Sequence, residues 1–205
     1  MPGARQSTSG AQAEGTACST PGDSCSTNWS GLEVWNGTFT GVSADWTIPT
    51  VTPTGTALED SSTWIGLNGD PTFDDSYEPS PIQVGTDSPS ESGSIVYEAW
   101  YELLPGLEIP LFEVSPGDAI QAVINETSPG NWQMAIGDLT SGIAWSASDI
   151  TYDSPGLTAE WIEEATDLCT GSADSDCAMS QLQNFGSVKF TQIAYAHTGT
   201  DNAHD

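Results

Sequence analysis

The chain has 205 residues, with 29 Asp and Glu against 2 Lys and Arg, and its formal net charge at pH 7 is -27. Such a charge argues against binding to nucleic acid or to an anionic membrane surface, because both are themselves negatively charged. The length suits one hydrophobic core, so we expect a flexible N-terminal arm at 1–26 and a single folded domain at 27–205.

The excess of acidic residues suits two environments, and composition alone leaves both open. In acid the carboxylates take up protons, and a chain with almost no basic residues then avoids the cationic self-repulsion that drives acid unfolding. At high salt, screening weakens the repulsion among the carboxylates instead.

The four cysteines form two close pairs, Cys18 with Cys25 and Cys169 with Cys177. Each pair encloses a polar loop, which predicts two local disulfides, an oxidising compartment and hence a secreted, extracellular protein. The N-terminus has no hydrophobic signal core, and no apolar run is long enough to span a bilayer. Neither cysteine spacing is of the Cys-x-x-Cys type, and both histidines lie near the C-terminus, so no metal site is expected.

Short strands separated by Gly- and Pro-containing turns are predicted along most of the chain. They lie within 28–49 and at 61–69, where the strand runs into a Gly-bounded turn, and at 81–85, 95–104, 119–125, 132–139, 143–147, 157–163 and 185–195. Only 176–183 has a weakly helical pattern, and 70–80 is an acidic loop that lacks the spacing of a calcium-binding EF-hand. Many short strands at near-regular spacing predict an all-β fold, a two-sheet antiparallel β-sandwich.

The stretch 157–164, Leu-Thr-Ala-Glu-Trp-Ile-Glu-Glu, places an acid inside an apolar, strand-forming run. Because side chains alternate along a strand, Glu160 shares its face with Thr158 and Ile162, while Trp161 points to the other face. A carboxyl group in such surroundings has a raised pKa, which suits proton transfer in acid. Glu160 is therefore the first candidate for chemistry, although a Glu on a half-buried strand is more often a solvated residue.

The strand predicted at 95–104 carries bulky groups on both faces. Glu98, Trp100 and Glu102 share one face, and Tyr101 lies on the other. This pattern indicates a central strand whose polar face lines a groove.

Several common catalytic motifs are absent from the sequence. It contains no Gly-x-Ser-x-Gly elbow, no Asp-Thr-Gly or Asp-Ser-Gly, and no glycine-rich phosphate loop before a helix. A serine hydrolase of the α/β type, a paired-aspartate protease and a cofactor-dependent enzyme are therefore unsupported, and no cofactor is expected.

Five short motifs occur in the order found in one known family. They read Trp-Ile-Gly-Leu-Asn-Gly at 64–69, Ile-Gln-Val-Gly-Thr-Asp at 82–87, Tyr-Glu-Ala-Trp-Tyr-Glu at 97–102, Val-Ser-Pro-Gly-Asp at 114–118 and Ala-Glu-Trp-Ile-x-Glu at 159–164. With these motifs the chain resembles the glutamic peptidases, or eqolisins, acid endopeptidases of fungi and some prokaryotes. The resemblance covers most of the chain, from 28–31 to 185–188.

This resemblance implies a concanavalin A-like jelly-roll sandwich, polypeptide substrates and a catalytic pair that matches Gln83 and Glu160. Glu160 would take a proton from the water that attacks a peptide carbonyl and later give it to the departing nitrogen. Gln83 would donate a hydrogen bond to the oxyanion and accept one from the water. From its residues alone, Gln83 reads as a polar residue at a strand end. We expect a monomer.

The chain departs from the family pattern at two places. Asn68 stands where the family usually has Asp, and an Asn cannot supply a charge. Leu103-Leu104-Pro105 replaces the family's Tyr-Pro, which would alter side-chain preference in the groove. The candidate substrate-binding residues are Trp64, Asn68, Trp100 and Tyr101.

Two other functions remain open from the sequence. A glycoside hydrolase could draw its carboxylate pair from Glu98, Glu102 and Glu160 on one groove. A carbohydrate-binding module could use the Trp and Tyr side chains without catalysis.

Overall fold

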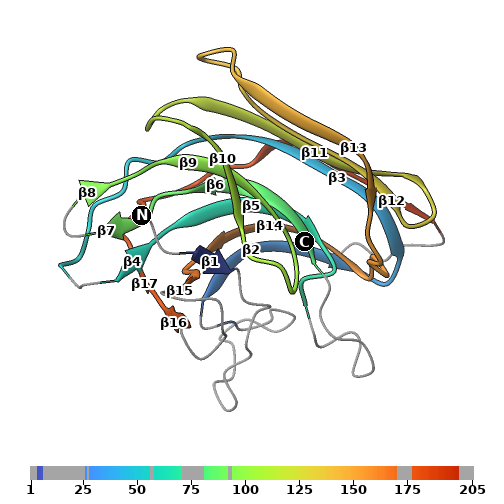
Figure 1. Cartoon of the computed structure of the whole chain (residues 1–205), viewed down its shortest axis with the longest axis horizontal. Coiled ribbons are helices and arrows are strands. Elements are labelled where there is room, and N and C mark those ends of the chain that lie inside the picture. Colours follow the sequence, from blue (N-terminus) through green and yellow to red (C-terminus); the bar gives the residue numbers. More distant parts are fainter. Residues whose placement is uncertain are drawn as a thin grey trace.

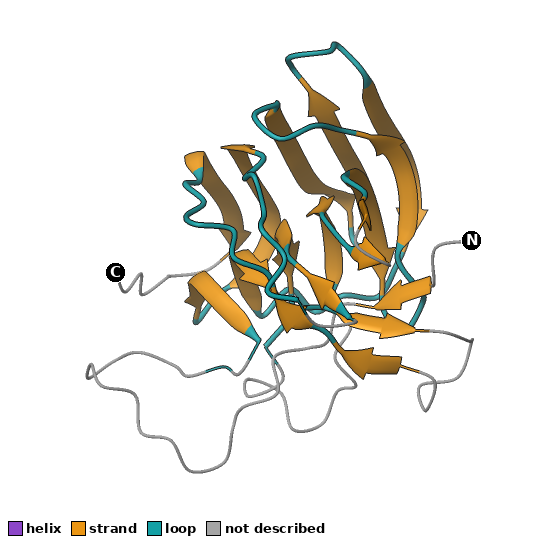
Figure 2. Ribbon diagram, turned by 90° about the vertical axis from the view of Figure 1, so that its left-hand side faces the viewer, coloured by secondary structure: helices purple, strands orange, loops and turns teal. Residues whose placement is uncertain are grey.

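The computed structural model describes residues 4–6, 26, 28–55, 58–70, 81–91, 94–169 and 177–198. Over these ranges the backbone forms strands, turns and loops, and Figure 2 shows no helix among them. Accordingly, this part of the chain contains no helix long and apolar enough to cross a membrane.

The larger of two main sheets has six strands, each antiparallel to its neighbours. Their order is β10 (Ile109–Glu113), β9 (Glu98–Leu103), β6 (Ile82–Asp87), β5 (Ser62–Leu67), β14 (Thr158–Glu164) and β2 (Trp29–Trp35). Because β14 lies between β5 and β2, the sheet is complete only when a late segment of the chain inserts between two early ones.

The second main sheet has five antiparallel strands and lies over one face of the first (Figure 1). Their order is β13 (Ala144–Thr151), β12 (Asn131–Asp138), β11 (Ala119–Ser128), β3 (Thr38–Thr47) and β18 (Thr191–Thr198). The two sheets form a sandwich.

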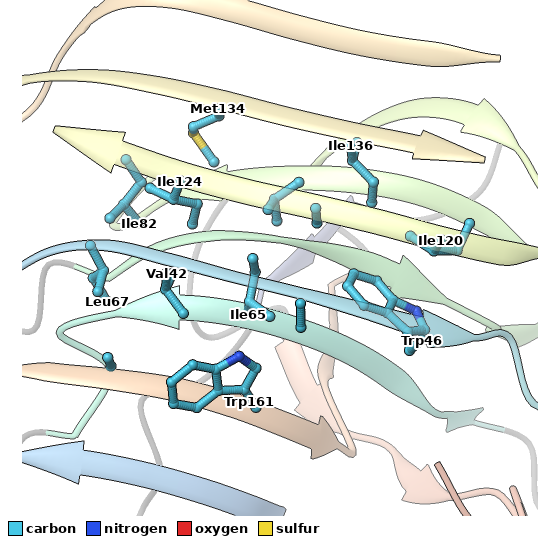
Figure 3. Packing of buried hydrophobic residues seen from close by; sticks show 14 of the residues in the cluster. Val42, Trp46, Ile65, Leu67, Ile82, Ile120, Ile124, Met134, Ile136 and Trp161 are labelled. Atoms are coloured by element: carbon cyan, nitrogen blue, oxygen red, sulfur yellow. The ribbon is translucent and has the colours of Figure 1, made fainter. Parts of the chain in front are cut away.

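Apolar side chains from both sheets fill the space between them, as Figure 3 shows. This core includes Val42, Trp46, Ile65, Leu67, Ile82, Ile120, Ile124, Met134, Ile136 and Trp161. Since successive side chains point to opposite faces of a strand, the residues between the core positions of the six-stranded sheet point away from the sandwich. We call that side of the six-stranded sheet its outer face.

Two smaller sheets complete the described fold. One has the order β17 (Gln181–Leu182), β4 (Glu59–Asp60), β7 (Ser90–Glu91) and β8 (Ser94–Ile95), and the other β1 (Ala4–Gln6), β15 (Asp167–Cys169) and β16 (Cys177–Met179).

The weakly helical pattern at 176–183 gave a wrong prediction for the described part of that segment. β16 is antiparallel to β15, and β17 is parallel to β4. Pairing with other strands, nearby in sequence for β16 and distant for β17, outweighs a weak local helical preference. Cys177 is disulfide-bonded, and Cys169 lies directly opposite it in the ladder. The pairing of these two cysteines stays a prediction, and Cys18 and Cys25 lie outside the described residues.

The antiparallel two-sheet sandwich predicted from the sequence is confirmed. Its jelly-roll connectivity stays a prediction, as does the division into an arm at 1–26 and a domain at 27–205. Within that predicted arm, Ala4–Gln6 forms β1 and pairs with β15.

Candidate active site

Five residues form one row across the outer face of the six-stranded sheet. Residues directly opposite each other in an antiparallel pair project from the same face. Glu160 lies opposite Glu33 on one side and Gly66 on the other. Gln83 lies opposite Gly66 and Glu102. The row therefore runs from β2 to β9 in the order Glu33, Glu160, Gly66, Gln83, Glu102.

Gly66 leaves the position between Gln83 and Glu160 without a side chain. Neighbouring strands lie about 4.8 Å apart, so the backbones of Gln83 and Glu160 are about 10 Å apart. A Cβ atom at Gly66 would lie 3.3 Å from Cγ of Gln83 and 2.7 Å from Cζ3 of Trp64. The absence of a side chain at Gly66 thus makes room for the Trp64 ring and the Gln83 side chain.

Glu160 is fully buried, and one of its two carboxyl oxygens is firmly held. Oε1 accepts a hydrogen bond of 2.7 Å from the Gly69 N–H and another from the Thr158 hydroxyl. Oε2 has no hydrogen-bond partner among the described residues. Burial raises the pKa of Glu160 to about 7, against the opposing effect of the bonds from Thr158 and Gly69. The group can therefore hold or release a proton within the physiological range.

Asn68 shapes the turn that presents Gly69 to Glu160. Its φ of 67° lies in the left-handed region, which Asn tolerates better than most residues. Its N–H donates to the Thr158 carbonyl at 3.1 Å, and its Oδ1 accepts the Leu157 N–H at 3.2 Å. These bonds require an acceptor and a left-handed backbone at position 68 rather than a charge, so an Asn is suitable there.

A methyl group at Gly69 is expected to disturb Glu160. The added Cβ would lie 2.7 Å from Glu160 Oε2 and 2.9 Å from Trp29 Cη2. We expect Gly69→Ala to lower the kcat/KM for peptide hydrolysis by about tenfold through misplacement of the carboxyl group. Gly37→Ala is the matched control, because its Cβ would meet nothing closer than 3.4 Å. Equal kcat/KM values for the two folded variants would show that the Gly69 contact does not matter.

Gln83 is fully buried, yet neither its Oε1 nor its Nε2 has a hydrogen-bond partner among the described residues. The same is true of the indole N–H groups of Trp29 and Trp100. Buried polar groups are nearly always hydrogen-bonded, so a set of them without partners on one face indicates a site that receives a ligand or water. Together with Glu160 Oε2, these atoms supply both donors and acceptors.

The next row along the outer face is built from large apolar residues and glycines. Ile162 lies opposite Trp64, and Gly85 lies opposite both Trp64 and Trp100. A Cβ at Gly85 would lie 2.6 Å from Trp64 Cβ and 2.9 Å from Trp100 Cζ2, so the glycine makes room for both indoles. Trp64 also donates its N–H to Glu164 at 2.9 Å. These apolar side chains therefore lie on the same face as Gln83 and Glu160, two residues further along the strands.

The structure thus brings Gln83, Glu160, Trp64 and Trp100 together on the outer face. Of the other two candidates for substrate binding, Asn68 lies in the turn after β5, and Tyr101 lies on the opposite face. It packs into the core between the sheets, where its ring stacks on Trp145 with centroids 4.7 Å apart and planes 14° from parallel. Tyr101 is corrected to a core residue, because neighbouring residues of one strand cannot both face the groove.

Sequence reasoning did not single out Glu33 or Gly66 as parts of this site. Alternation along 29–35 could have indicated which face Glu33 occupies. Its position opposite Glu160 depends on the pairing of β2 with β14, and no local pattern encodes that pairing.

Three acidic residues, two on the sheet and one just before β10, could hold a metal ion. One carboxylate oxygen from each of Asp87, Glu98 and Glu108 lies within 4.8 Å of the others. Asp87 and Glu98 are directly opposite each other, and four residues of β6, about 13 Å, separate Asp87 from Gln83. Acidic clusters are common without a metal, so we assign no metal site here.

Other buried carboxyl groups are held by neutral donors. Glu163 accepts hydrogen bonds from the hydroxyl groups of Ser61 and Thr63, the latter at 2.6 Å. Glu164 accepts bonds from the Trp64 indole and from Asn28 at 3.0 Å. The hydroxyl groups of Ser61 and Thr63 can also accept a bond from a protonated Glu163, so they suit both protonation states of that carboxyl group.

The raised pKa values of Glu163 and Asp167 favour their protonated forms in the folded state. Burial raises the pKa of Glu163 to about 7, and burial also raises the pKa of Asp167. Asp138 is the opposite case: burial raises its pKa, but hydrogen bonds from Ser141 and Thr140 outweigh this effect and leave the pKa lowered.

We expect the protein to be more stable in acid than at neutral pH. Glu160 and Glu163 have folded pKa values of about 7, against about 4.3 in an unfolded chain. The folded state therefore holds more protons, and the stability present below pH ~4 is lost as the pH rises towards about 7. The Tm at low ionic strength should be higher at pH ~4 than at pH ~7, and about 1 M salt should recover part of the loss at neutral pH.

Thermal melts at both pH values, with and without salt, measure this difference. Adaptation to high salt would instead give a salt-dependent Tm at neutral pH without tolerance of acid. A low-salt Tm at pH ~7 equal to or above that at pH ~4 contradicts the acid account.

A β-sandwich that presents a glutamine and a glutamate on one sheet face, with a glycine between them, has the arrangement expected of a glutamic peptidase. A sequence model of the Peptidase A4 family matches residues 27–204, so the chain belongs to this family of peptidases, hydrolases that act on peptide bonds.

Known relatives agree with this assignment. The chain is 27% identical to Aspergillopepsin-2 of Aspergillus niger over 204 residues and 28% identical to Scytalidopepsin B of Scytalidium lignicola over 178 residues. These matches cover 88% and 84% of this chain, and 68% and 64% of the relatives, about two thirds of their length. The solved structure of SCP-B, an eqolisin in complex with the tripeptide Ala-Ile-His, matches with a TM-score of 0.68 at 27% identity. The match covers 85% of this chain and 82% of that one.

Proposed function

We propose that this protein is an endopeptidase that uses Gln83 and Glu160 as its catalytic pair on polypeptide substrates. The observation that carries the proposal is their shared row. Both are fully buried on the outer face, on either side of Gly66, and Gln83 has no hydrogen-bond partner among the described residues. Membership of the Peptidase A4 family supports the same reaction.

In the first step, a water molecule between the two side chains attacks the peptide carbonyl carbon. Glu160 Oε2 takes the proton of that water as general base. The carbonyl oxygen gains the negative charge, and the Gln83 Nε2–H donates a hydrogen bond to it. Gln83 suits this role because an amide donates without changing its charge at any working pH.

In the second step, the tetrahedral intermediate collapses. The C–N bond breaks, and Glu160 gives the proton it received to the departing nitrogen, which leaves as an amine. Glu160 returns to its ionised form, so the site is restored after one turnover. The Gly69 N–H and the Thr158 hydroxyl keep Oε1 in place throughout, so Oε2 stays directed at the reacting atoms.

The general-base role fixes the sign of the pH dependence. Glu160 must be ionised to accept a proton, and its pKa is raised by burial to about 7. We expect kcat/KM to rise with pH between about 4 and 6, by up to tenfold per pH unit, while the fold is intact. Loss of stability at higher pH then places the activity optimum on the acid side of neutrality. Initial rates measured where circular dichroism shows native protein would check this. A kcat/KM that falls over this range would assign the protonated form of Glu160 to the first step.

A three-part assay tests the function itself. The purified protein is incubated in acid with a denatured protein, with a soluble polysaccharide and with an insoluble polysaccharide. We expect peptides to be released and no reducing sugar to appear. Release of reducing sugar without peptides would identify a glycoside hydrolase, and retention on polysaccharide with neither product would identify a binding module.

The geometry does not favour the glycosidase alternative. Two strands separate Glu102 from Glu160, which puts their backbones about 14 Å apart. Carboxyl groups of glycosidases lie only about 5–9.5 Å apart. Both side chains would have to lean towards each other across Gly66 and Gln83.

Secretion and a monomeric state belong to the same proposal. The disulfide at Cys177 fits an oxidising compartment.

A further inference from the structure

Glu33 has no part in the catalytic pair, yet it lies directly opposite Glu160. It comes from the edge strand β2 and projects from the same face as Glu160. A half-buried acid beside a fully buried acid is costly when both are charged, so the pair must be stabilised by other groups.

The partner of Glu33 is Asp70, whose carboxyl group forms a hydrogen bond with it. Two ionised carboxylates only accept hydrogen bonds, so one member of this pair must carry a proton. Burial, followed by the nearby charges of Glu160 and Asp70, raises the pKa of Glu33 to about 9. Glu33 is therefore the member that holds the proton, and it donates to the Asp70 carboxylate.

Asp70 in turn belongs to the turn that holds Glu160. The Gly69 N–H donates to Glu160 Oε1 at 2.7 Å, and the Asp70 N–H stabilises the same carboxylate. The Asp70 charge acts in the opposite direction and raises the pKa of Glu160. One residue of this turn thus contributes both a donor and a charge to the site, and Glu33 is bonded to that residue.

We propose that Glu33 is a positioning residue for the peptidase reaction: its hydrogen bond to Asp70 fixes the turn whose N–H groups hold Glu160, and keeps the Asp70 carboxylate beside Glu160. The inference rests on the proposed function, because it assigns a role relative to Glu160. It adds a carboxyl pair, Glu33 and Asp70, to the Gln83–Glu160 dyad.

Few other titratable groups of the described chain face Glu160. β5 carries none, and β6 carries only Asp87, four residues beyond Gln83. On β14 itself Glu164 shares the face, four residues away, and Glu102 lies beyond Gln83 on β9. Glu33 and Asp70 are therefore the carboxyl groups placed to act on Glu160.

The first test compares Glu33→Ala with Glu33→Gln. The Ala variant removes the donor to Asp70, whereas the Gln variant keeps a neutral N–H donor of nearly the same shape. We expect Glu33→Ala to lower kcat by about tenfold with KM nearly unchanged, and Glu33→Gln to stay within about twofold of wild type. Glu113→Ala, at an exposed position on the opposite edge strand β10, is the control and should keep full activity. Equal losses in both Glu33 variants, or none in Glu33→Ala, would overturn the proposal.

The second test measures the titration of Glu160 directly, so it does not depend on enzyme activity. Asp70→Asn removes the charge and can still accept the Glu33 hydrogen bond. We expect the titration midpoint of the Glu160 carboxyl carbon, followed by 13C NMR, to fall by about one pH unit in this variant. The rising limb of kcat/KM should move to lower pH by the same amount. An unchanged Glu160 midpoint would refute the role of the Asp70 charge.

The two proposals fail in different ways. Absence of peptide hydrolysis in the wild-type protein would contradict the function, and the NMR midpoint would still decide the Glu33–Asp70–Glu160 coupling. An active wild type, an inactive Glu160→Gln and a fully active Glu33→Ala would contradict this inference alone.

Discussion

Glu160→Gln is expected to lower kcat/KM for peptide hydrolysis by at least ~10²-fold while the fold stays intact. The substituted amide has nearly the same shape, and its oxygen can still accept the bonds from Gly69 and Thr158. It cannot take a proton from water. Because burial of a charged Glu160 is costly and a neutral amide avoids that cost, the Tm of the variant near neutral pH should equal or exceed that of wild type.

Initial rates on a peptide substrate and a thermal melt measure both effects. Glu113→Gln, at an exposed position on β10, is the control for the loss of one carboxylate from the same sheet. Glu102→Gln is a poor control, since Glu102 is fully buried directly beside Gln83. More than half of wild-type turnover in folded Glu160→Gln would remove Glu160 from the mechanism.

Gln83→Ala is expected to lower kcat by about 10²–10³-fold, with a smaller change in KM. The substitution removes the donor to the oxyanion, an interaction that is strongest in the transition state. Gln121→Ala is the matched control, because this exposed glutamine lies on β11 of the other sheet and bonds Asp45. The kcat values of the two variants are compared at one pH.

Gln83→Glu sharpens the test of the same role. A protonated carboxyl can donate to the oxyanion, whereas a carboxylate cannot. The variant should therefore keep part of its activity in acid and lose that activity as the carboxyl group at position 83 ionises. Wild type has an amide at this position and should show no such loss. A pH profile parallel to that of wild type would show that position 83 does not donate to the reacting oxygen.

Alternation along single strands predicted which residues share a face. The separation of Glu160 and Ile162 from Trp161 holds in the structure, as does that of Trp100 from Tyr101. These features depend only on the backbone period of a strand, which a sequence displays directly. The same rule should have excluded Tyr101 from the groove.

Features that depend on strand pairing could not be read in this way. Glu160, Gly66 and Gln83 meet because β14 pairs with β5, which lies far from it in sequence, and β5 pairs with β6. Gln83 was indicated by the resemblance to a family, since its local pattern suggested only a polar strand end. Glu33 was missed because its neighbour is set by the β2–β14 register. The short strand at 181–182 also forms through a distant partner, β4.

The most direct test of the catalytic pair is a crystal structure of the Glu160→Gln variant with an uncleaved substrate peptide. We expect the scissile carbonyl oxygen to lie within hydrogen-bond distance, about 3 Å, of Gln83 Nε2. One water molecule should lie between the carbonyl carbon and the side chain at position 160. A peptide bound on another face of the sandwich, or one whose scissile carbonyl points away from Gln83, would contradict it.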